Sequence, residues 1–245
     1  MENSTDKKMT GGEAIVKSLI NEGVETIFGL PGIQLDPMFN ALHDSSNEIR
    51  VVNARHEQGV AYMAFGYAQS TGKPGVYAVV PGPGILNTTA ALSTAYACNS
   101  RVLAITGQIP SSYIGRELGM LHEIPNQLSV LEGLTKFAKR INYPSDAPAI
   151  VSEAFKNMRS GRPRPTAIEM PMDIMQHKSE VTLRNFTDGY SPPAADPDLI
   201  KEAALILGAA KNPVIFVGTG AYEAGKEVTI LAEMLQAPVI LSLIH

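Results

Sequence analysis

Three loops rich in glycine and proline hold the residues of this chain whose types and spacing could perform chemistry. They cover residues 29–32, 53–59 and 81–84, and each follows a short run of β-forming residues. In an α/β protein, ligands bind where loops leave the carboxyl ends of strands, and glycine lets the backbone approach a ligand closely. One such loop by itself usually serves only to turn the chain. It is the combination of the three that predicts a binding site.

Glu57 is the acidic residue of the second loop, within the run RHEQG. Taken alone, a carboxylate at a helix start is an ordinary solvated group that the helix dipole stabilises. It could also share a proton with a bound base if its surroundings exclude water. Its neighbours leave both roles open, because Arg55 could pair with an acidic group and His56 is more often a surface or hydrogen-bonded residue than a catalyst.

Familiar metal and nucleotide motifs do not occur in the sequence. It contains no CxxC, HExxH or GDG run, no cage of Asp and Asn at ligand spacing, and no Walker-type phosphate loop. Gly218 and Gly220 follow a strand pattern, but a plain strand–helix turn accounts for them, and the acidic Glu223 nearby does not attract a phosphate. We predict no metal site within this chain.

The composition is that of a globular, mildly acidic protein. Hydrophobic residues make up 44% and charged residues 18% of the 245 residues, and the net charge is −4. This charge excludes an electrostatic nucleic-acid binder. The polar N-terminus has no signal-peptide core, and no apolar run approaches the roughly 20 residues of a membrane span. With Cys98 as its single cysteine, the chain forms no intrachain disulfide. We expect a soluble cytoplasmic protein.

Strand and helix patterns alternate along the first two thirds of the chain. A capping box at Thr10–Glu13 begins a helix, and a long helix of small residues is expected over 57–71. A further helix is expected from the third loop to about residue 98, and another over 147–160. This alternation predicts an α/β fold with a parallel sheet and helices on both faces. The predicted strands cover residues 26–29, 50–53, 75–80, 102–106, 136–141 and 166–170.

We predict a first domain over residues 1–178, a linker over 179–196 and an incomplete second α/β domain over 197–245. The linker is polar and contains two adjacent prolines, Pro192 and Pro193. The second domain shows only two strand patterns, and a sheet of two parallel strands is too small to stand alone. We therefore expect either a truncated chain or a partner that completes this sheet.

Four segments together resemble one known family. They are IFGLPG, RHEQGVAYMAFGYAQSTGKPGV, VPGPGILNTTAALSTAY and VLAITGQIP. In this order and approximate spacing they resemble the pyrimidine-binding domain of thiamine-diphosphate-dependent enzymes of the acetolactate synthase type. The resemblance covers about residues 9–173, where GRPRPTAIEMPMDI matches the way that domain closes. A weaker likeness continues into a Rossmann-like middle domain.

The resemblance assigns the main chemical role to Glu57. In this family a glutamate hydrogen-bonds N1′ of the cofactor's aminopyrimidine ring and favours its imino form. The ring then removes the C2 proton to give an ylide, which adds to a 2-oxo acid or an aldehyde. Glu57 can share a proton with the ring only in a water-poor site, where burial favours the protonated carboxyl and opposes the helix dipole. We expect burial to dominate.

The resemblance also implies roles for residues of the other loops. Pro31 and Gly32 would line the thiazolium side of the cofactor, and Gln108 would lie near the channel for the substrate or an accessory cofactor. His122 stands where acetolactate synthases usually have glutamine, in a loop that is longer here, and could relay a proton to a substrate oxygen. The aminopyrimidine edge would be held by Gly82, Pro83, Gly84 and Asn87.

The family's cofactor site is completed outside this chain. Relatives bind the diphosphate through Mg²⁺, held by a GDG motif and an asparagine in a C-terminal domain, and the pyrimidine domain of one subunit meets the diphosphate domain of another. We therefore expect a homodimer or homotetramer with the active site at the subunit interface. The chain by itself is expected to be inactive. Some relatives bind FAD in the middle domain, but it is not predicted here.

The resemblance predicts a transferase or lyase that decarboxylates or ligates a 2-oxo acid, plausibly pyruvate. A benzoylformate decarboxylase, aldehyde lyase or dione hydrolase type stays open, whereas Glu57 disfavours a carboligase that lacks this glutamate. The alternatives from other classes are a non-catalytic binding or regulatory module with the same loops, and a generic flavin- or nucleotide-binding α/β protein.

Overall fold

The computed structural model describes residues 6–183 and 193–242. The chain divides into two compact units, Met1–Tyr190 and Ser191–His245. Within the described residues, no helix combines the length and the apolar character that crossing a membrane requires.

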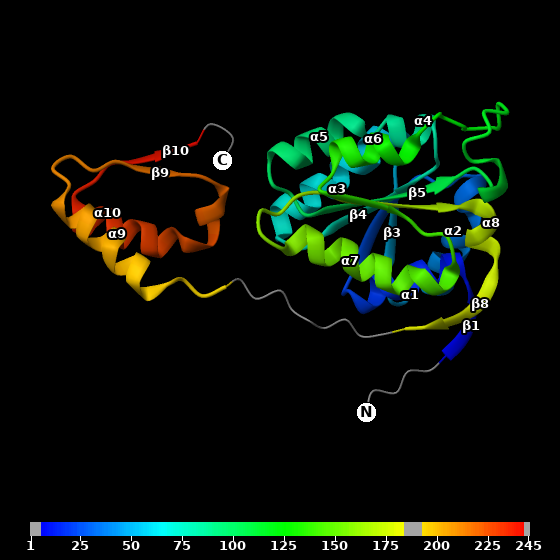
Figure 1. The fold of residues 1–245 in the computed structure, drawn as a ribbon, viewed down its shortest axis with the longest axis horizontal. Coiled ribbons are helices and arrows are strands. Elements are labelled where there is room, and N and C mark those ends of the chain that lie inside the picture. Colours follow the sequence, from blue (N-terminus) through cyan, green and yellow to red (C-terminus); the bar gives the residue numbers. More distant parts are fainter. Residues whose placement is uncertain (1–5, 184–192, 243–245) are drawn as a thin grey trace. The chain divides into compact units, whose positions relative to one another are not determined.

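The first unit is built on a sheet of six parallel strands (Figure 1). Strand order is β3-β2-β4-β5-β7-β6, and every neighbouring pair is parallel. All residues of the three strands β4, β5 and β7 are buried, because helices cover both faces. The predicted α/β fold is confirmed. The strands are β2 (Thr26–Gly29), β3 (Arg50–Asn53), β4 (Gly75–Val79), β5 (Val102–Gln108), β6 (Phe137–Arg140) and β7 (Thr166–Pro171).

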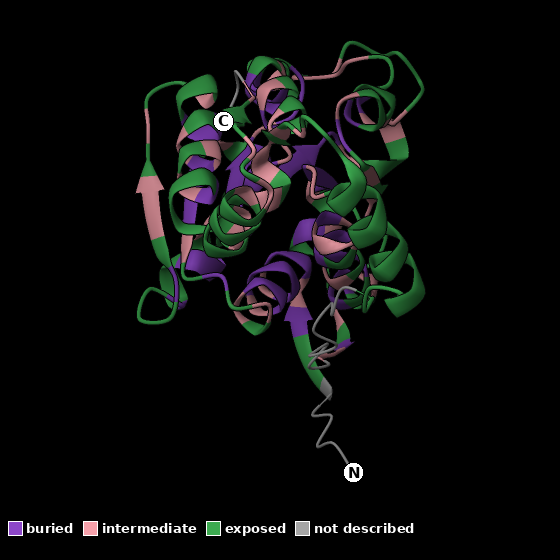
Figure 2. Cartoon of the chain, turned by 90° about the vertical axis from the view of Figure 1, so that its left-hand side faces the viewer, coloured by how far each residue is buried: buried purple, intermediate pink, exposed green. Residues whose placement is uncertain are grey.

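Two helical layers enclose this sheet, and each contributes to its own core cluster. One layer contains α1 (Gly11–Asn21), α2 (Asp36–Asp44) and α7 (Ala147–Arg159), and the other contains α3 (Glu57–Thr71), α5 (Thr89–Ala97) and α6 (Gln127–Leu134). Figure 1 shows the two layers on opposite faces. In Figure 2 the buried residues gather on the strands and on the helix sides that face them.

Short-range signals set several helix ends as predicted. Thr10 Oγ1 accepts a hydrogen bond from the Glu13 amide (3.1 Å) and Glu13 Oε2 accepts one from the Thr10 amide (2.6 Å), so the capping box of α1 is formed. At the start of α3, His56 Nδ1 accepts a hydrogen bond from the Gln58 amide (3.1 Å), which gives His56 a capping role. Helix α3 ends at Gly72 in the left-handed conformation.

The helix expected from the third loop to residue 98 is two helices. Helix α4 (Pro83–Leu86) is a single turn, and α5 follows after Asn87 and Thr88. The buried Thr88 hydroxyl donates to the Ile85 carbonyl (2.7 Å) and the Thr88 amide donates to the same oxygen (3.0 Å). These tighter contacts replace the usual helical hydrogen bonds and break the helix after Asn87.

The linker expected from residue 179 begins instead with an ordered strand. Strand β8 (Lys178–Thr182) follows the short helix α8 (Met172–Gln176) and pairs antiparallel with β1 (Asp6–Thr10). Met9 and Val181 are the buried side chains that join this ribbon to the core. One apolar residue per strand is a weak sequence signal, which explains why neither strand was predicted. Pro192 lies outside the described residues.

The second unit shows the predicted alternation. Its strands β9 (Ile215–Val217) and β10 (Val239–Leu241) are parallel, and α9 (Pro197–Ala209) and α10 (Gly225–Leu235) accompany them. The glycines after β9 lead into a 3-10 helix, η4 (Thr219–Ala224). Large apolar side chains stay exposed among its described residues, among them Leu205, Phe216 and Met234. The three remaining short helices, in the first unit, are η1 (Ile33–Leu35), η2 (Ser111–Tyr113) and η3 (Pro144–Asp146).

Candidate active site

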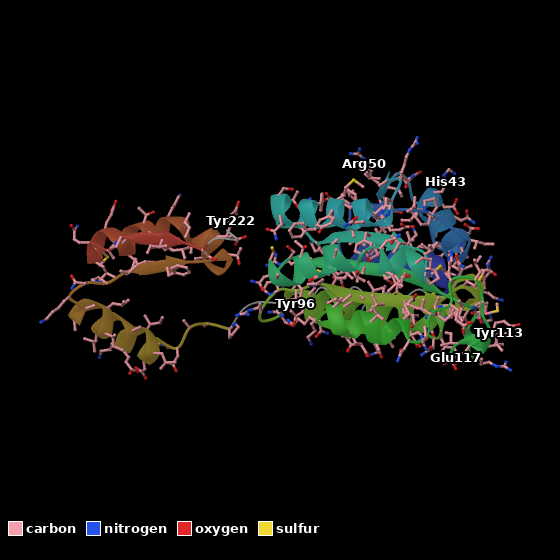
Figure 3. All side chains as sticks on the ribbon, turned by 90° about the horizontal axis from the view of Figure 1, so that it is seen from above. His43, Arg50, Tyr96, Tyr113, Glu117 and Tyr222 are labelled. Atoms are coloured by element: carbon pink, nitrogen blue, oxygen red, sulfur yellow. The ribbon has the colours of Figure 1, made fainter. Side chains whose placement is uncertain are left out.

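The three predicted loops lie at one edge of the sheet. They leave the carboxyl ends of β2, β3 and β4, which are neighbours in the strand order and run parallel. The Leu30 amide donates to the Ala78 carbonyl (3.1 Å), so the first loop continues the sheet contact to β4. In Figure 3, the two ends of β5 can be located by two labelled residues of the first unit. Tyr96, which precedes β5, lies at one end of the unit, and Tyr113, which follows β5, lies at the opposite end.

Glu57 and Asn87, from two of these loops, are bound to each other. Asn87 Nδ2 donates to Glu57 Oε2 at 2.9 Å. Glu57 is the first residue of α3 and Asn87 is the C-cap of α4, so both side chains are placed by helix ends at the sheet edge. The second carboxylate oxygen, Oε1, has no hydrogen bond to the residues that the structure describes. It lies 3.8 Å from where a Cβ on Gly84 would be.

The expected water-poor setting of Glu57 is only partly present in this chain. Glu57 is half-buried and Asn87 is exposed. Solvent therefore still reaches the Glu57 side chain in this chain.

Glycine is required at three positions in the first and third loops because other atoms occupy the space of a side chain. A Cβ on Gly32 would lie 2.4 Å from Val80 Cγ1, and a Cβ on Gly84 would lie 2.5 Å from Val80 Cγ2. Gly82 has a φ of +59°, and a Cβ there would lie 2.3 Å from the His122 carbonyl oxygen. Val80 therefore packs between the first and third loops. Pro31 and Pro83 are exposed beside them.

His122 is brought to the same place by the loop after β5. Its backbone has a φ of +70° and its carbonyl covers Gly82. Its side-chain Nδ1 is buried and has no hydrogen-bond partner among the described residues. The neighbouring Glu123 carboxylate accepts a hydrogen bond from the Met120 amide (2.8 Å), which shapes the loop. Thus His122 lies against the third loop, whereas its role toward a substrate stays a prediction.

Gln108 faces the interior at the end of β5. Its Nε2 lies 3.4 Å from Glu169 Oε2, and its Oε1 accepts a hydrogen bond from the Ile109 amide (2.8 Å). Both polar atoms of the buried side chain are thereby engaged within the sheet edge. The position predicted for Gln108 beside a substrate channel stays a prediction.

Several residues of this edge were missed by the sequence analysis. Gln127 accepts a hydrogen bond from the Gly82 amide (2.9 Å) and reaches the buried Glu169. Gln34, 3% exposed, packs against Gly107, and its Oε1 has no partner among the described residues. The only signal for any of them was the acidic Glu169 within the apolar strand pattern TAIEM.

Comparison with known proteins agrees with this architecture. Residues 9–130 match the sequence profile described as "Thiamine pyrophosphate enzyme, N-terminal TPP binding domain". The chain belongs to this family. Its first unit is therefore a thiamine-diphosphate (TPP) enzyme N-terminal domain, with the six-stranded parallel sheet as the pyrimidine-binding fold.

Curated relatives of the chain include enzymes with different printed activities. The chain is 35% identical over 240 residues to the probable 2-ketoarginine decarboxylase of Pseudomonas aeruginosa, covering 96% of this chain and 42% of the relative. It is 34% identical over 241 residues to the large subunit of acetolactate synthase isozyme 1 of Escherichia coli, covering 98% of this chain and 42% of the relative. A probable acetolactate synthase large subunit of Methanocaldococcus jannaschii is 36% identical over 243 residues, which are 96% of this chain and 40% of the relative. The chain spans about two fifths of the length of these relatives.

The described residues hold no group of three or more His, Cys, Asp or Glu side chains that could bind a metal ion. The role of the hydrogen-bonded pair Glu57 and Asn87 toward a cofactor stays a prediction.

Proposed function

We propose that this chain supplies the pyrimidine-binding half of a thiamine-diphosphate-dependent enzyme that acts on 2-oxo acids. The observation that supports this best is the Glu57 carboxylate, which Asn87 holds through one oxygen while the other oxygen has no partner among the described residues. A carboxylate fixed in this way can receive a ring N–H through its second oxygen. The glycines of the three turns would let the backbone approach a bound ring closely.

The donor set fits the cofactor's aminopyrimidine. When bound, thiamine diphosphate supplies a carbon nucleophile that adds to the carbonyl of the substrate. Glu57 would hold a proton between its carboxylate and the ring nitrogen N1′, and Asn87 would fix the carboxylate for this contact. Gly82, Pro83 and Gly84 would line the ring edge, and Pro31 and Gly32 the thiazolium side. A partner surface over Glu57 would exclude the water that reaches its side chain.

The finer parts of this proposal concern the complete enzyme. They comprise Mg²⁺ bound with the diphosphate by residues outside this chain, and a homodimer or homotetramer with the site between subunits. Because the named relatives include a decarboxylase and acetolactate synthases, both decarboxylation and carboligation are supported, and pyruvate is the first substrate to test. Gln108 and His122 are the proposed substrate-side residues, and His122 is the candidate for choosing between substrates.

The test is turnover by the complete polypeptide that contains these residues, supplied with thiamine diphosphate and Mg²⁺ and offered pyruvate, 2-ketoarginine and benzoylformate. Glu57→Gln keeps the side-chain shape and removes the shared proton, so kcat should fall by about 100-fold or more. The matched control is Glu48→Gln, which removes another helix-flanking acid from a solvent-exposed pair with Lys17. Near wild-type rates in Glu57→Gln would contradict the assigned role. Absence of turnover in the wild type with all three acids would contradict the proposed substrate class.

A further inference from the structure

A buried side-chain amide connects the Gly82 turn with strands β5 and β7. Gln127, in α6, is 1% exposed. Its Oε1 accepts a hydrogen bond from the Gly82 amide (2.9 Å), and its Nε2 donates to Glu169 Oε2 (2.7 Å) and to the Gly107 carbonyl (3.0 Å). Every polar atom of this side chain is therefore used, in an interior where an unmade hydrogen bond is costly.

Glu169 and the Gly107 carbonyl, which both accept from Gln127 Nε2, fix which way the Gln127 amide points. The Glu169 side chain is fully buried in β7, and Arg140 Nε donates to its Oε1 at 2.6 Å. A carboxylate paired with a guanidinium only accepts hydrogen bonds, so it must face the amide nitrogen of Gln127 and not its oxygen. The oxygen is thereby turned toward the Gly82 amide. The ion pair on β6 and β7 thus helps to hold the Gln127 oxygen in place to accept from the Gly82 amide on the third loop.

Loss of the hydrogen bond to Gln127 would act on the backbone of Gly82. Its backbone has φ +59° and ψ −121°, and because glycine adopts many other conformations as readily, the residue does not hold itself there. It caps the single-turn helix α4, whose C-cap is Asn87. Moving the start of so short a helix also moves its end. The hydrogen bond from the Gly82 amide to Gln127 therefore lies one helical turn away from the Asn87–Glu57 pair.

We propose that Gln127 is a positioning residue for Glu57: it holds the Gly82 turn against the buried Glu169 and so keeps Asn87 on the Glu57 carboxylate. The consequence for the cofactor rests on the function proposed above. The coupling from Gln127 to Asn87 is a property of the chain without cofactor. The two can be tested separately.

The experiment is nuclear magnetic resonance on the 245-residue chain without cofactor, comparing Gln127→Met with Thr135→Val. Met keeps the length of Gln and loses all its hydrogen bonds. Thr135 is the matched control, because it is buried, directly follows α6, and bonds only the Leu131 and Phe137 carbonyls, far in sequence from Gly82. Two signals are followed: hydrogen exchange of the Gly82 amide, and the pH response of the Asn87 side-chain amide as the Glu57 carboxyl titrates.

In Gln127→Met the Gly82 amide should exchange about tenfold faster relative to the β4 amides, as expected for one lost interior hydrogen bond. The pH response of Asn87 should fall by about half or more, because the side chain leaves the carboxylate for part of the time. Thr135→Val should leave both signals as in the wild type. A general loss of packing would instead speed exchange in β4 and in both variants alike, and that result would overturn the proposal.

Glu169→Gln provides a second route if Gln127→Met does not fold. This change keeps the shape of the side chain and replaces the charge-assisted hydrogen bond from Gln127 Nε2 with a weaker neutral one, so Gly82 exchange should rise by about threefold or more while α6 stays folded. Unchanged Gly82 exchange and an unchanged Asn87 response in a folded variant would overturn the proposal. None of these readouts involves turnover, so a failure here is distinct from near wild-type activity of Glu57→Gln.

Discussion

At the residue scale, the candidate site depends on glycines, which have no side chain, as much as on its polar side chains. Gly82 lies beneath the His122 carbonyl and has a positive φ, and Gly84 is pressed against Val80. Both glycines lie in the turn that carries Asn87 to Glu57. The turn is thus specified by close backbone approach, and the two polar residues are placed by it.

Gly82→Ala should therefore destabilise the first unit by about 2 kcal/mol or more, since it adds backbone strain of roughly 1–3 kcal/mol and a contact with the His122 carbonyl. Gly66→Ala is the matched control, because Gly66 is exposed within α3 and has nothing within 4 Å of its Cβ position. That change should stabilise the chain by about 0.5–1 kcal/mol. Urea unfolding measures both. Equal effects of the two substitutions would contradict the geometry described for Gly82.

At the element scale, α1 and α7 are joined by a carboxylate whose position disfavours its charged form. Glu22 is the C-cap of α1, and Arg159 of α7 donates from Nη1 to Glu22 Oε2 (3.1 Å) and from Nη2 to the Glu22 carbonyl (3.4 Å). Burial raises the pKa of Glu22 above its usual value of 4.5, and the Arg159 guanidinium only partly opposes this rise. The negative end of the helix dipole at the C-terminus of α1 acts in the same direction as burial.

This raised pKa predicts a pH dependence of stability. Between pH 4.5 and the folded pKa, the folded chain binds more protons at Glu22 than the unfolded chain, so the free energy of unfolding falls as pH rises through this range. Glu22→Gln should remove this part of the fall, measured by urea unfolding at about pH 4 and about pH 7. Glu48→Gln, in an exposed ion pair, should keep the wild-type dependence. A steeper fall in Glu22→Gln would show that the ion pair outweighs burial.

At the scale of the whole molecule, the two units differ in how much core they possess. Among the residues that the structure describes, the first has a six-stranded sheet covered on both faces, whereas the second has two strands of three residues each. No residue of α9 or α10 is buried. In a two-stranded sheet with exposed apolar side chains, little packing opposes the opening of the backbone hydrogen bonds.

Amides of β9 and β10 should consequently exchange at least about a hundredfold faster than those of β5 in the 245-residue chain. Strand β3 is the matched comparison within the first unit, because it is also short and also at a sheet edge, yet it packs in a large sheet. Exchange followed by mass spectrometry should place β3 between β9 and β5. Equal protection of β9 and β5 would contradict the assignment of a weak second unit.

The sequence by itself determined the elements whose signals are local. The predicted bounds of β3 and α3 match the structure, since hydrophobic period, capping residues and glycines act within a few positions of one another. The parallel pairing of the strands followed from the alternation, whereas their order in the sheet did not, and the resemblance named the family. These features require no knowledge of distant residues.

Only the tertiary structure decided which distant residues meet. Strands β1 and β8 were missed because each forms only by pairing with the other, and the two lie far apart in the sequence of the first unit. The Asn87–Glu57 bond spans 30 positions and the Gln127–Glu169 bond spans 42. A buried amide that is hydrogen-bonded to a distant carboxylate produces neither a hydrophobic period nor a capping motif in the sequence. Its partners are determined by the packing of the sheet and not by neighbours along the chain.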